Sequence, residues 1–222
     1  SISHEFNNLL SPIMGYSMLA LEKLPPEQTE VYDDLLEIYN ASRKAKTLVR
    51  RLSDLSRKHP ETVFRPLSPD ALVRKVMSVA RPARPENITV HLDLACGEET
   101  TMVGGEMQLT QILLNLVLNA FDAMESGGEL TVSTQLRGED VLFTVSDTGP
   151  GITPENLPHI FDPFFTTKPE GKGTGLGLAI AKSVAEMHGG SIQVKSDLDG
   201  TVFTVKLKTH FDINREQFEV AE

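Results

Sequence analysis

Two asparagine side chains, Asn115 and Asn119, stand four residues apart in the stretch QILLNLVLNAFDAM at residues 111–124. At helical spacing they lie one turn apart on one face. The rest of the stretch is almost continuously apolar, so we expect a buried helix that packs against a sheet. Two glycine-bearing segments follow, DTGPGI at 147–152 and GKGTGLG at 171–177. Amides on a rigid helix opposite bare glycine backbone indicate a magnesium–phosphate site, and we predict an ATP pocket.

The second glycine segment fits neither of two common phosphate-binding motifs. A P-loop needs a lysine followed by Ser or Thr, but Gly173 follows Lys172. The dinucleotide fingerprint GxGxxG fails as well, because the glycines fall at alternate positions. The segment runs directly into a helical pattern, and the free N–H groups at the start of a helix attract anions. A phosphate-binding loop is therefore favoured over a flexible linker.

The order of these motifs resembles that of the sensor histidine kinases. N-x-x-x-N-A-x-D-A, D-x-G-x-G, FDPFFTTK and G-x-G-x-G-L-G-L follow one another like their N, G1, F and G2 boxes. The resemblance covers roughly residues 62–208. The ATP-binding domain of that family is shared with DNA gyrase, a heat-shock chaperone family and mismatch-repair ATPases. The resemblance implies ATP and Mg²⁺ as cofactors.

The resemblance also implies a role for each motif residue. Asn119 would hold Mg²⁺, and Asn115 would line the phosphate side. Asp147 would accept a hydrogen bond from the adenine amino group, while Gly149 and Gly151 let the backbone approach the base. The glycines of the second segment would wrap the phosphates, and its lysine would add a positive charge. The remaining candidate cofactor-binding residues are Asp122, Lys168, Lys172, Gly173, Thr174, Gly175, Leu176 and Gly177.

Three features of this region have a simpler structural interpretation. The two asparagines could be core amides with satisfied hydrogen bonds, although the glycines and the aspartate favour a pocket. The aromatic residues Phe161, Phe164 and Phe165 fit core packing as well as they fit anchors of a lid over ATP. His188, just before two glycines, is expected to be a cation at a helix C-terminus rather than a catalytic group.

The expected nucleophile is His4, in SHEFNNLL. This segment resembles the H box of the histidine kinases, in the HDFNNLL variety of the nitrogen-regulator type. Glu5 would accept the Nδ1 proton, orient the ring and act as base, which leaves Nε2 free to attack the γ-phosphorus. Asn8 lies one helical turn beyond His4. Its spacing from Glu5 is similar to that of bifunctional members, where the amide orients water for dephosphorylating a partner.

The elements that present this histidine read as a helical hairpin. A helical pattern over residues 2–24 ends at Pro25-Pro26, because neither proline donates a backbone hydrogen bond. A second helix, about 28–57, carries a heptad seam. The seam consists of Val31, Leu35, Ile38, Ser42, Ala45, Val49, Leu52 and Ser56. One hairpin cannot bury two apolar sides, so we predict that two copies pair as a homodimeric four-helix bundle.

The remainder reads as one α/β domain. TVFRPL and NITVHLDLA are strand candidates, and SPDALVRKVMSVARPA is a helix capped by Ser68. Two hairpins, around residues 137–140 and 199–200, supply further strands. The fold class expected is therefore α+β with two domains. The helical hairpin spans 1–58, a linker and first strand 59–67, an α/β sandwich ATP-binding domain of the gyrase, chaperone and histidine kinase type 68–210, and a tail 211–222.

The composition excludes several function classes. A net charge of −10 argues against a nucleic-acid binder, which would need a basic face. One cysteine, Cys96, excludes a disulfide framework and fits a reducing compartment. No run of about 18 apolar residues occurs, so no membrane contact is expected within this segment. The abrupt start in SISHEF favours a fragment, a cytoplasmic catalytic module whose full-length protein could be membrane-attached.

The function expected is ATP-dependent autophosphorylation of His4 and transfer of the phosphoryl group to an aspartate of a response-regulator receiver. Two alternatives stay open: an ATP-gated dimeric clamp of the chaperone or mismatch-repair kind, and a non-catalytic or phosphatase-dominant scaffold. Gyrase-type relatives carry a water-activating glutamate where this chain has Asn115. A neutral amide cannot take that proton, so poor ATP hydrolysis is expected.

Overall fold

The computed structural model describes residues 2–25, 28–56, 63–169 and 173–210. The chain divides into two compact units, residues 1–57 and residues 58–222. The described residues of the first unit form helices, and those of the second form helices and strands.

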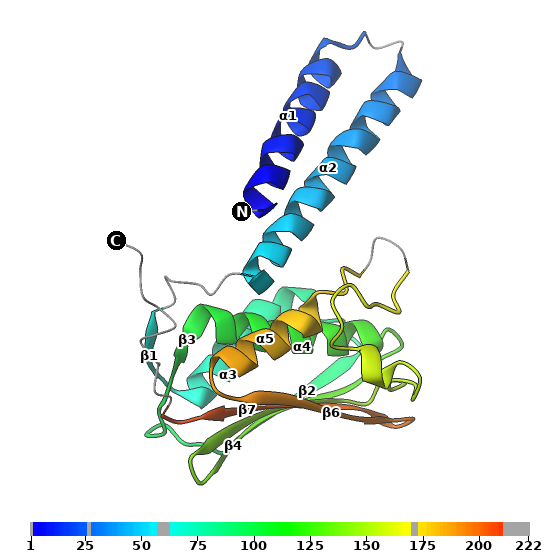
Figure 1. Ribbon diagram of the computed structural model, residues 1–222. Helices are drawn as coiled ribbons and strands as arrows, with labels where there is room; N and C mark the ends of the chain where they lie inside the picture. The colour runs from blue at the N-terminus through cyan, green and yellow to red at the C-terminus, as the bar shows by residue number, and fades with distance from the viewer. Residues whose placement is uncertain (1, 26–27, 57–62, 170–172, 211–222) are drawn as a thin grey trace, which may run out of the picture. The chain divides into compact units, whose positions relative to one another are not determined.

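The N-terminal unit is an antiparallel pair of helices, α1 (Ile2–Lys23) and α2 (Thr29–Ser56), as Figure 1 shows. Pro12 lies inside α1, where it cannot donate to the carbonyl of Asn8. The connection between the helices is tightened by the amide of Gln28, which donates to the carbonyl of Pro25 at 3.1 Å. The predicted helical hairpin is confirmed.

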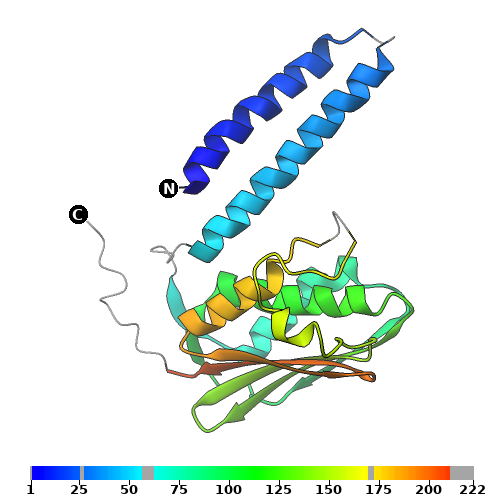
Figure 2. The same cartoon turned by 45° about the vertical axis from the view of Figure 1, so that its right-hand side comes forward.

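The C-terminal unit is a two-layer α/β sandwich, in which three helices cover one face of a sheet (Figures 1 and 2). The helices are α3 (Pro69–Ala80), α4 (Glu106–Ala123) and α5 (Gly177–Met187), with 3-10 turns η1 (Arg81–Ala83) and η2 (Leu157–His159). The strands are β1 (Phe64–Leu67), β2 (Ile88–Leu94), β3 (Met102–Gly105), β4 (Gly128–Arg137), β5 (Asp140–Asp147), β6 (Ser191–Asp197) and β7 (Gly200–Lys208). This is the fold class that the sequence predicts.

The main sheet has the strand order β2-β4-β5-β7-β6. Its only parallel pair within the described residues is β2 with β4, and its other neighbours are antiparallel. Strand β1 pairs separately with β3, in antiparallel register. Two corrections to the sequence-based assignment follow: β3 has no counterpart in it, and α4 begins at Glu106, five residues before the predicted start at residue 111.

The core lies between the helices and the sheet. Along β5 every second residue is buried, so one face of the strand meets the helices. Val132, Phe143 and Val145 of β4 and β5 are at most 1% exposed, and Leu116 and Val117 of α4 are equally buried. These contacts hold one face of α4 against the sheet and leave the opposite face unburied.

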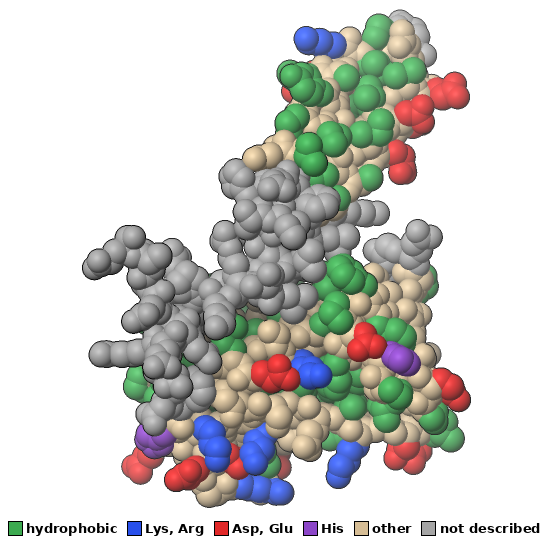
Figure 3. Space-filling view, viewed as in Figure 1, with side chains coloured by type: hydrophobic (Ala, Val, Ile, Leu, Met, Phe, Trp, Pro, Cys, Tyr) green, Lys and Arg blue, Asp and Glu red, His purple; other side chains and the backbone are tan. Residues whose placement is uncertain are grey.

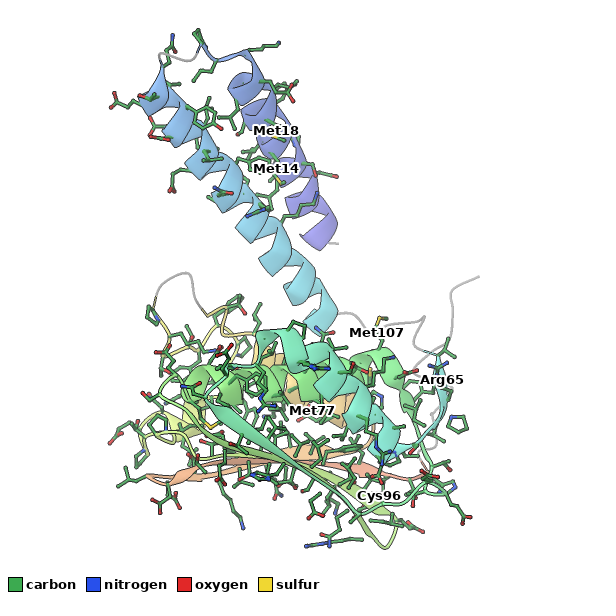
Figure 4. All side chains as sticks on the ribbon, turned by 180° about the vertical axis from the view of Figure 1, so that it is seen from behind. Met14, Met18, Arg65, Met77, Cys96 and Met107 are labelled. Atoms are coloured by element: carbon green, nitrogen blue, oxygen red, sulfur yellow. The ribbon has the colours of Figure 1, made fainter. Side chains whose placement is uncertain are left out.

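The start of α4 is held by neighbours on both sides. Glu106, in its first turn, forms ion pairs with Arg65 of β1 and with Lys75 of α3, the latter at 2.5 Å (Arg65 is labelled in Figure 4). The first turn of α3 is itself capped, because Ser68 accepts a hydrogen bond from the amide of Ala71. The predicted Ser68 cap is confirmed.

Candidate functional site

The face of α4 that turns away from the sheet carries the polar residues. Asn115 and Asn119 are half-buried, and Asp122 is 58% exposed at its side chain. Leu116 and Val117, between the two amides in sequence, are buried against the sheet. The apolar residues therefore fix the rotation of the helix, and this rotation lines up the amides and the carboxylate along its open side. A pair of fully buried core amides is excluded.

The glycine segment before α5 meets this polar face at Asn115. The Asn115 amide Nδ2 donates to the carbonyl of Gly177 at 3.4 Å, where α5 begins. Leu176 is fully buried and anchors the segment in the core. Thr174 accepts a hydrogen bond from the amide of Leu176 at 3.5 Å. Two of the predicted residues on different elements are thereby brought together.

The same segment depends on glycine at two positions. Gly175 has φ +63°, and a Cβ there would collide with the backbone of Phe164, whose amide donates to the Gly175 carbonyl at 2.9 Å. At Gly173 a side chain would run into Thr166 and Lys168. Lys172, also predicted to bind the nucleotide, lies outside the described residues.

Lys168 brings a positive charge to the middle of the polar face. Its Nζ lies 2.5 Å from Oδ2 of Asp122 and 3.4 Å from Oδ1 of Asn119. Three residues that the family resemblance named, Asn119, Asp122 and Lys168, therefore converge on one point. Sequence spacing gave no sign of this pairing, because Lys168 and Asp122 are 46 positions apart.

The segment after β5 meets the end of α4 at Ala123, one turn beyond Asn119. Asp147, the last residue of β5, is 6% exposed, and the amide of Gly149 donates to its Oδ1 at 2.9 Å. Gly149 lies close enough to the end of α4 that a Cβ on it would crowd Ala123. Gly151 has φ +73°, and a side chain there would collide with the carbonyl of Asp197.

Burial and backbone hydrogen bonds act on the pKa of Asp147 in opposite directions. Burial raises the pKa of the Asp147 carboxyl, while hydrogen bonds from the backbone amides of Gly149 and Thr201 oppose that rise. The carboxyl sits at the base of the loop, aimed by two backbone donors. A buried acceptor fixed in this way can recognise one donor on a flat ligand.

The aromatic cluster is not core. Phe164 is 57% exposed and has φ +69°, while Phe161 and Phe165 are half-buried. The ring of Phe165 lies 5.8 Å from that of His159. The Nζ of Lys182 on α5 lies 5.9 Å from the centroid of Phe161. The core-packing interpretation is therefore wrong for Phe164, whereas Phe161 and Phe165 are partly packed.

His188 also differs from its expected role. It is 2% exposed at the end of α5, its Nδ1 donates to the carbonyl of Val184 at 2.8 Å, and its Nε2 accepts from the amide of Gly105 at 3.0 Å. Burial lowers the pKa of the imidazole. The expected helix-terminal cation is wrong, because a ring that accepts at Nε2 is neutral. His188 instead caps the N-terminus of α4, where Gly105 offers no side chain.

The phospho-acceptor candidates lie in the other unit. His4, Glu5 and Asn8 fall in the first two turns of α1, so the predicted helical spacing of His4 and Asn8 is confirmed. The side chain of Asn8 is exposed. The side chains of His4 and Glu5 lie outside the described residues.

Taken along α4, the site has a simple order. The glycine segment before α5 meets α4 at Asn115, and Lys168 meets it at Asn119 and Asp122. The segment after β5 meets it at Ala123. These positions span about 12 Å at 1.5 Å per residue. Oxygen ligands and a lysine in the middle suit a cation and phosphates, and the buried carboxyl at one end suits a neutral hydrogen-bonding ring.

Two protein families match separate parts of the chain. Residues 1–61 match the His Kinase A (phospho-acceptor) domain. Residues 104–210 match the histidine kinase-, DNA gyrase B- and HSP90-like ATPase.

Curated relatives cover nearly the whole chain. The sensor histidine kinase ZraS of Salmonella typhi is 34% identical over 209 residues, which are 93% of this chain and 44% of the relative. The sensor protein SrrB of Staphylococcus aureus (strain MRSA252) is 31% identical over 215 residues, 93% of this chain and 37% of the relative. The chain thus spans less than half the length of these relatives.

Solved structures share the fold. Full-length ShkA in complex with AMPPNP aligns with a TM-score of 0.74 at 28% identity, over 94% of this chain and 45% of that one. The catalytic domain of the histidine kinase ThkA aligns at 0.61 and 30% identity, over 66% and 96%. ThkA in complex with the response regulator protein TrrA aligns at 0.65 and 26% identity, over 94% and 60%.

Proposed function

The chain belongs to the histidine kinases, with a phospho-acceptor domain followed by the ATPase domain that this family shares with DNA gyrase B and HSP90, and we propose that it is the catalytic module of a sensor histidine kinase in a two-component phosphorelay. One observation carries the proposal. Three separate segments converge on the polar face of α4, in the chain that also holds His4 in a helical hairpin.

ATP is the proposed substrate of the C-terminal unit. Asp147 accepts a hydrogen bond from the adenine amino group, and Gly149 and Gly151 bring the backbone close to the base. The residues that bind the phosphates are Asn115, Lys168, Lys172, Gly173, Thr174, Gly175, Leu176 and Gly177. The contact between Asn115 and the Gly177 carbonyl supports this arrangement, since it holds the glycine segment over the helix.

Asn119 is the proposed magnesium ligand, with Asp122 beside it. The fit is supported by the amide oxygen of Asn119 and the carboxylate of Asp122, hard ligands that already converge on one ammonium. When bound, Mg²⁺ would neutralise charge on the phosphates of ATP. No cluster of three His, Cys, Asp or Glu side chains suited to a metal occurs in the part of the chain that the structure describes.

His4 is the proposed nucleophile. Its Nε2 attacks the γ-phosphorus, a nitrogen–phosphorus bond forms, and the bond to the bridging oxygen of ADP breaks. Glu5 accepts the Nδ1 proton and orients the ring. Asn115 supports transfer to a histidine over hydrolysis, because an amide at that position cannot activate water.

Dimerisation is the proposed role of the hairpin. Hydrophobic side chains lie on the described surface of the single hairpin (Figure 3). Leu9 and Tyr16 of α1 are 65% and 73% exposed. Met14 and Met18 add to the apolar surface of α1 (Figure 4). A second copy would cover this surface in a homodimeric four-helix bundle.

The proposed partner is the receiver domain of a response regulator, whose aspartate takes the phosphoryl group from His4. The ThkA–TrrA complex supports this choice by likeness. Asn8 is the proposed positioning residue for water in a second activity, dephosphorylation of that partner. An Asn8→Ala variant that kept full phosphatase activity would disprove this part.

The proposed domain division is a phosphotransfer hairpin at 1–58, a linker and first strand at 59–67, the ATP-binding domain at 68–210 and a tail at 211–222. No described helix combines the length and the apolar character needed to cross a bilayer. Dependence on ATP favours a cytoplasmic module. Nucleic acid is not a proposed partner, given the net charge of −10.

The test is incubation with Mg²⁺ and ATP labelled at the γ-phosphate. The label should be acid-labile and base-stable, as expected for phosphohistidine, and should vanish in His4→Gln while nucleotide binding survives. His91→Gln, a matched change at an exposed histidine of β2, should keep the label. ATP-driven association without labelled histidine would instead favour the dimeric clamp, and nucleotide binding with neither effect would favour a scaffold.

A further inference from the structure

The contact made by Lys168 resembles the binding of a cation by oxygen ligands. Its ammonium lies between Oδ2 of Asp122, at 2.5 Å, and Oδ1 of Asn119, at 3.4 Å. Asn119 and Asp122 are three residues apart on α4, so both oxygens project from one side of the helix. A lysine ammonium is a compact positive charge that only donates, so it fills the space between two acceptors much as a small cation would.

A divalent cation would need the same two oxygens. Magnesium bound through one or two protein oxygens completes its shell with water and nucleotide phosphates. An ammonium at 2.5 Å from the carboxylate leaves no room for a second cation on that oxygen, and two positive charges so close repel each other. Lysine and metal are therefore alternatives at this point.

The lysine can leave without unfolding its loop. Its backbone amide donates to Oγ1 of Thr166 at 3.2 Å, and its Cβ lies against Gly173, so the main chain is held. The side chain is 35% exposed, and its ammonium sits on a flexible stem of four carbons. Rotation about the bonds of this stem moves the ammonium off Asp122 while the loop stays in place.

From this geometry we propose that Lys168 is a built-in competitor of the divalent cation, which holds Asn119 and Asp122 until a metal–nucleotide complex displaces it. The inference rests on the proposed ATP site and describes how that site is regulated. A metal ion alone must break the Lys168–Asp122 pair and gains only two protein ligands. A metal that arrives with a nucleotide brings phosphate oxygens as further ligands, so metal binding becomes coupled to nucleotide binding.

The test measures binding of Mn²⁺ alone, without nucleotide, by electron paramagnetic resonance of the free ion. Lys168→Met should bind Mn²⁺ about tenfold more tightly than the wild-type chain, since a charge-assisted hydrogen bond no longer competes. Lys168→Gln should gain similarly. Lys195→Met removes the same charge from an exposed position on β6 and should leave the affinity unchanged.

Asp122→Asn, combined with Lys168→Met, gives a double-mutant cycle. In the Asp122→Asn background the gain from Lys168→Met should largely disappear, because the lysine has lost its carboxylate partner. An unchanged Mn²⁺ affinity in Lys168→Met, or an equal gain in Lys195→Met, would overturn the proposal. ATP titrations with Mg²⁺ on the same proteins separate the two claims: a wild-type chain that binds no nucleotide refutes the proposed function, whereas normal ATP binding with no Mn²⁺ gain refutes only the competition.

Discussion

The helix α4 of the C-terminal unit and the helices α1 and α2 of the N-terminal unit are all rich in apolar residues, but they place these residues differently. In α4 the apolar side chains lie against the sheet, with Leu116 and Val117 at most 1% exposed. In the hairpin, Ile38 of α2 is 47% exposed and Tyr16 of α1 is 73% exposed. Among the hairpin side chains that the structure describes, the buried ones are two serines, Ser17 and Ser42.

The C-terminal unit buries its apolar residues in its own core, whereas the single hairpin leaves many of its apolar residues uncovered. The sheet supplies the C-terminal unit with its own core, so a rigid polar face can be built on α4. Two helices cannot enclose a core between them, and a second hairpin is the simplest cover. Substitutions in the two units should therefore fail in different ways, association in one and folding or binding in the other.

The largest effect is expected from a charge in the heptad seam. Ile38→Asp would bury a carboxylate from each copy in the proposed bundle, at a total cost of at least about 4 kcal/mol, or roughly a thousandfold in dimer affinity. Sedimentation equilibrium measures the dissociation constant. Asp34→Ala, outside the seam, should leave the dimer intact. A dimer that survives Ile38→Asp would show that the hairpin does not pair along this seam.

Next comes a cavity beneath the polar face. Leu116→Ala should destabilise the C-terminal unit by about 3 kcal/mol, since Leu116 is 1% exposed between helix and sheet. Denaturant unfolding followed by circular dichroism checks this value, and the dimer should persist. Leu198→Ala, at a side chain that is 92% exposed, is the matched control and should change stability by less than about 0.5 kcal/mol. Equal losses for both would contradict the assigned core.

A smaller effect is expected at the proposed base contact. Asp147→Asn should weaken ATP binding about thirtyfold, or about 2 kcal/mol, because a charge-assisted hydrogen bond to adenine is lost. Calorimetric titration gives the affinity, with Asp93→Asn on β2 as control. GTP lacks the adenine amino donor, so the variant should not weaken any residual GTP binding by the same factor. A variant with unchanged ATP affinity would remove Asp147 from the site.

The smallest effect is the pH dependence set by His188. Burial lowers its pKa in the folded chain, so the unfolded chain takes up the proton first as the pH falls. The stability from neutral His188 is complete above the unfolded pKa, near about 6.5, and is lost below it. The slope cannot exceed about 1.4 kcal/mol per pH unit for one proton. Unfolding curves between pH 8 and 5 should show this loss, and His188→Gln should lack it while His91→Gln keeps it.

Patterns within short segments of the sequence predicted the helices and strands whose formation depends on neighbouring residues. The nearly continuous apolar stretch of α4, the alternation in β4 and β5, and the Ser68-Pro69 helix start all carry their signal within a few neighbouring residues. Strand β3 carries no such signal, because its four residues include two glycines. It is held as a strand by distant segments, since β1 pairs with it and the amide of Val103 donates to the carbonyl of Thr209 at 3.0 Å.

The contacts within the site could not be predicted from such short segments. Lys168 with Asp122, and His188 with Gly105, join residues 46 and 83 positions apart, and no periodicity within either segment indicates its partner. Motif order named Asp122 and Lys168 but not their contact. For His188 the neighbouring glycines suggested a helix end, yet they could not reveal that the ring is buried under another helix. Tertiary burial decides both cases.

The position of β7 constrains how the chain is made. The last strand that the structure describes, β7, lies inside the sheet, between β5 and β6, and not at its edge. During synthesis on a ribosome the sheet cannot close until Lys208 has emerged, and the imidazole that completes the start of α4 arrives almost as late. The hairpin emerges before the sheet is complete, and its local contacts can form at once. In the proposed homodimer, two nascent copies can thus pair through α1 and α2 before their C-terminal units have folded.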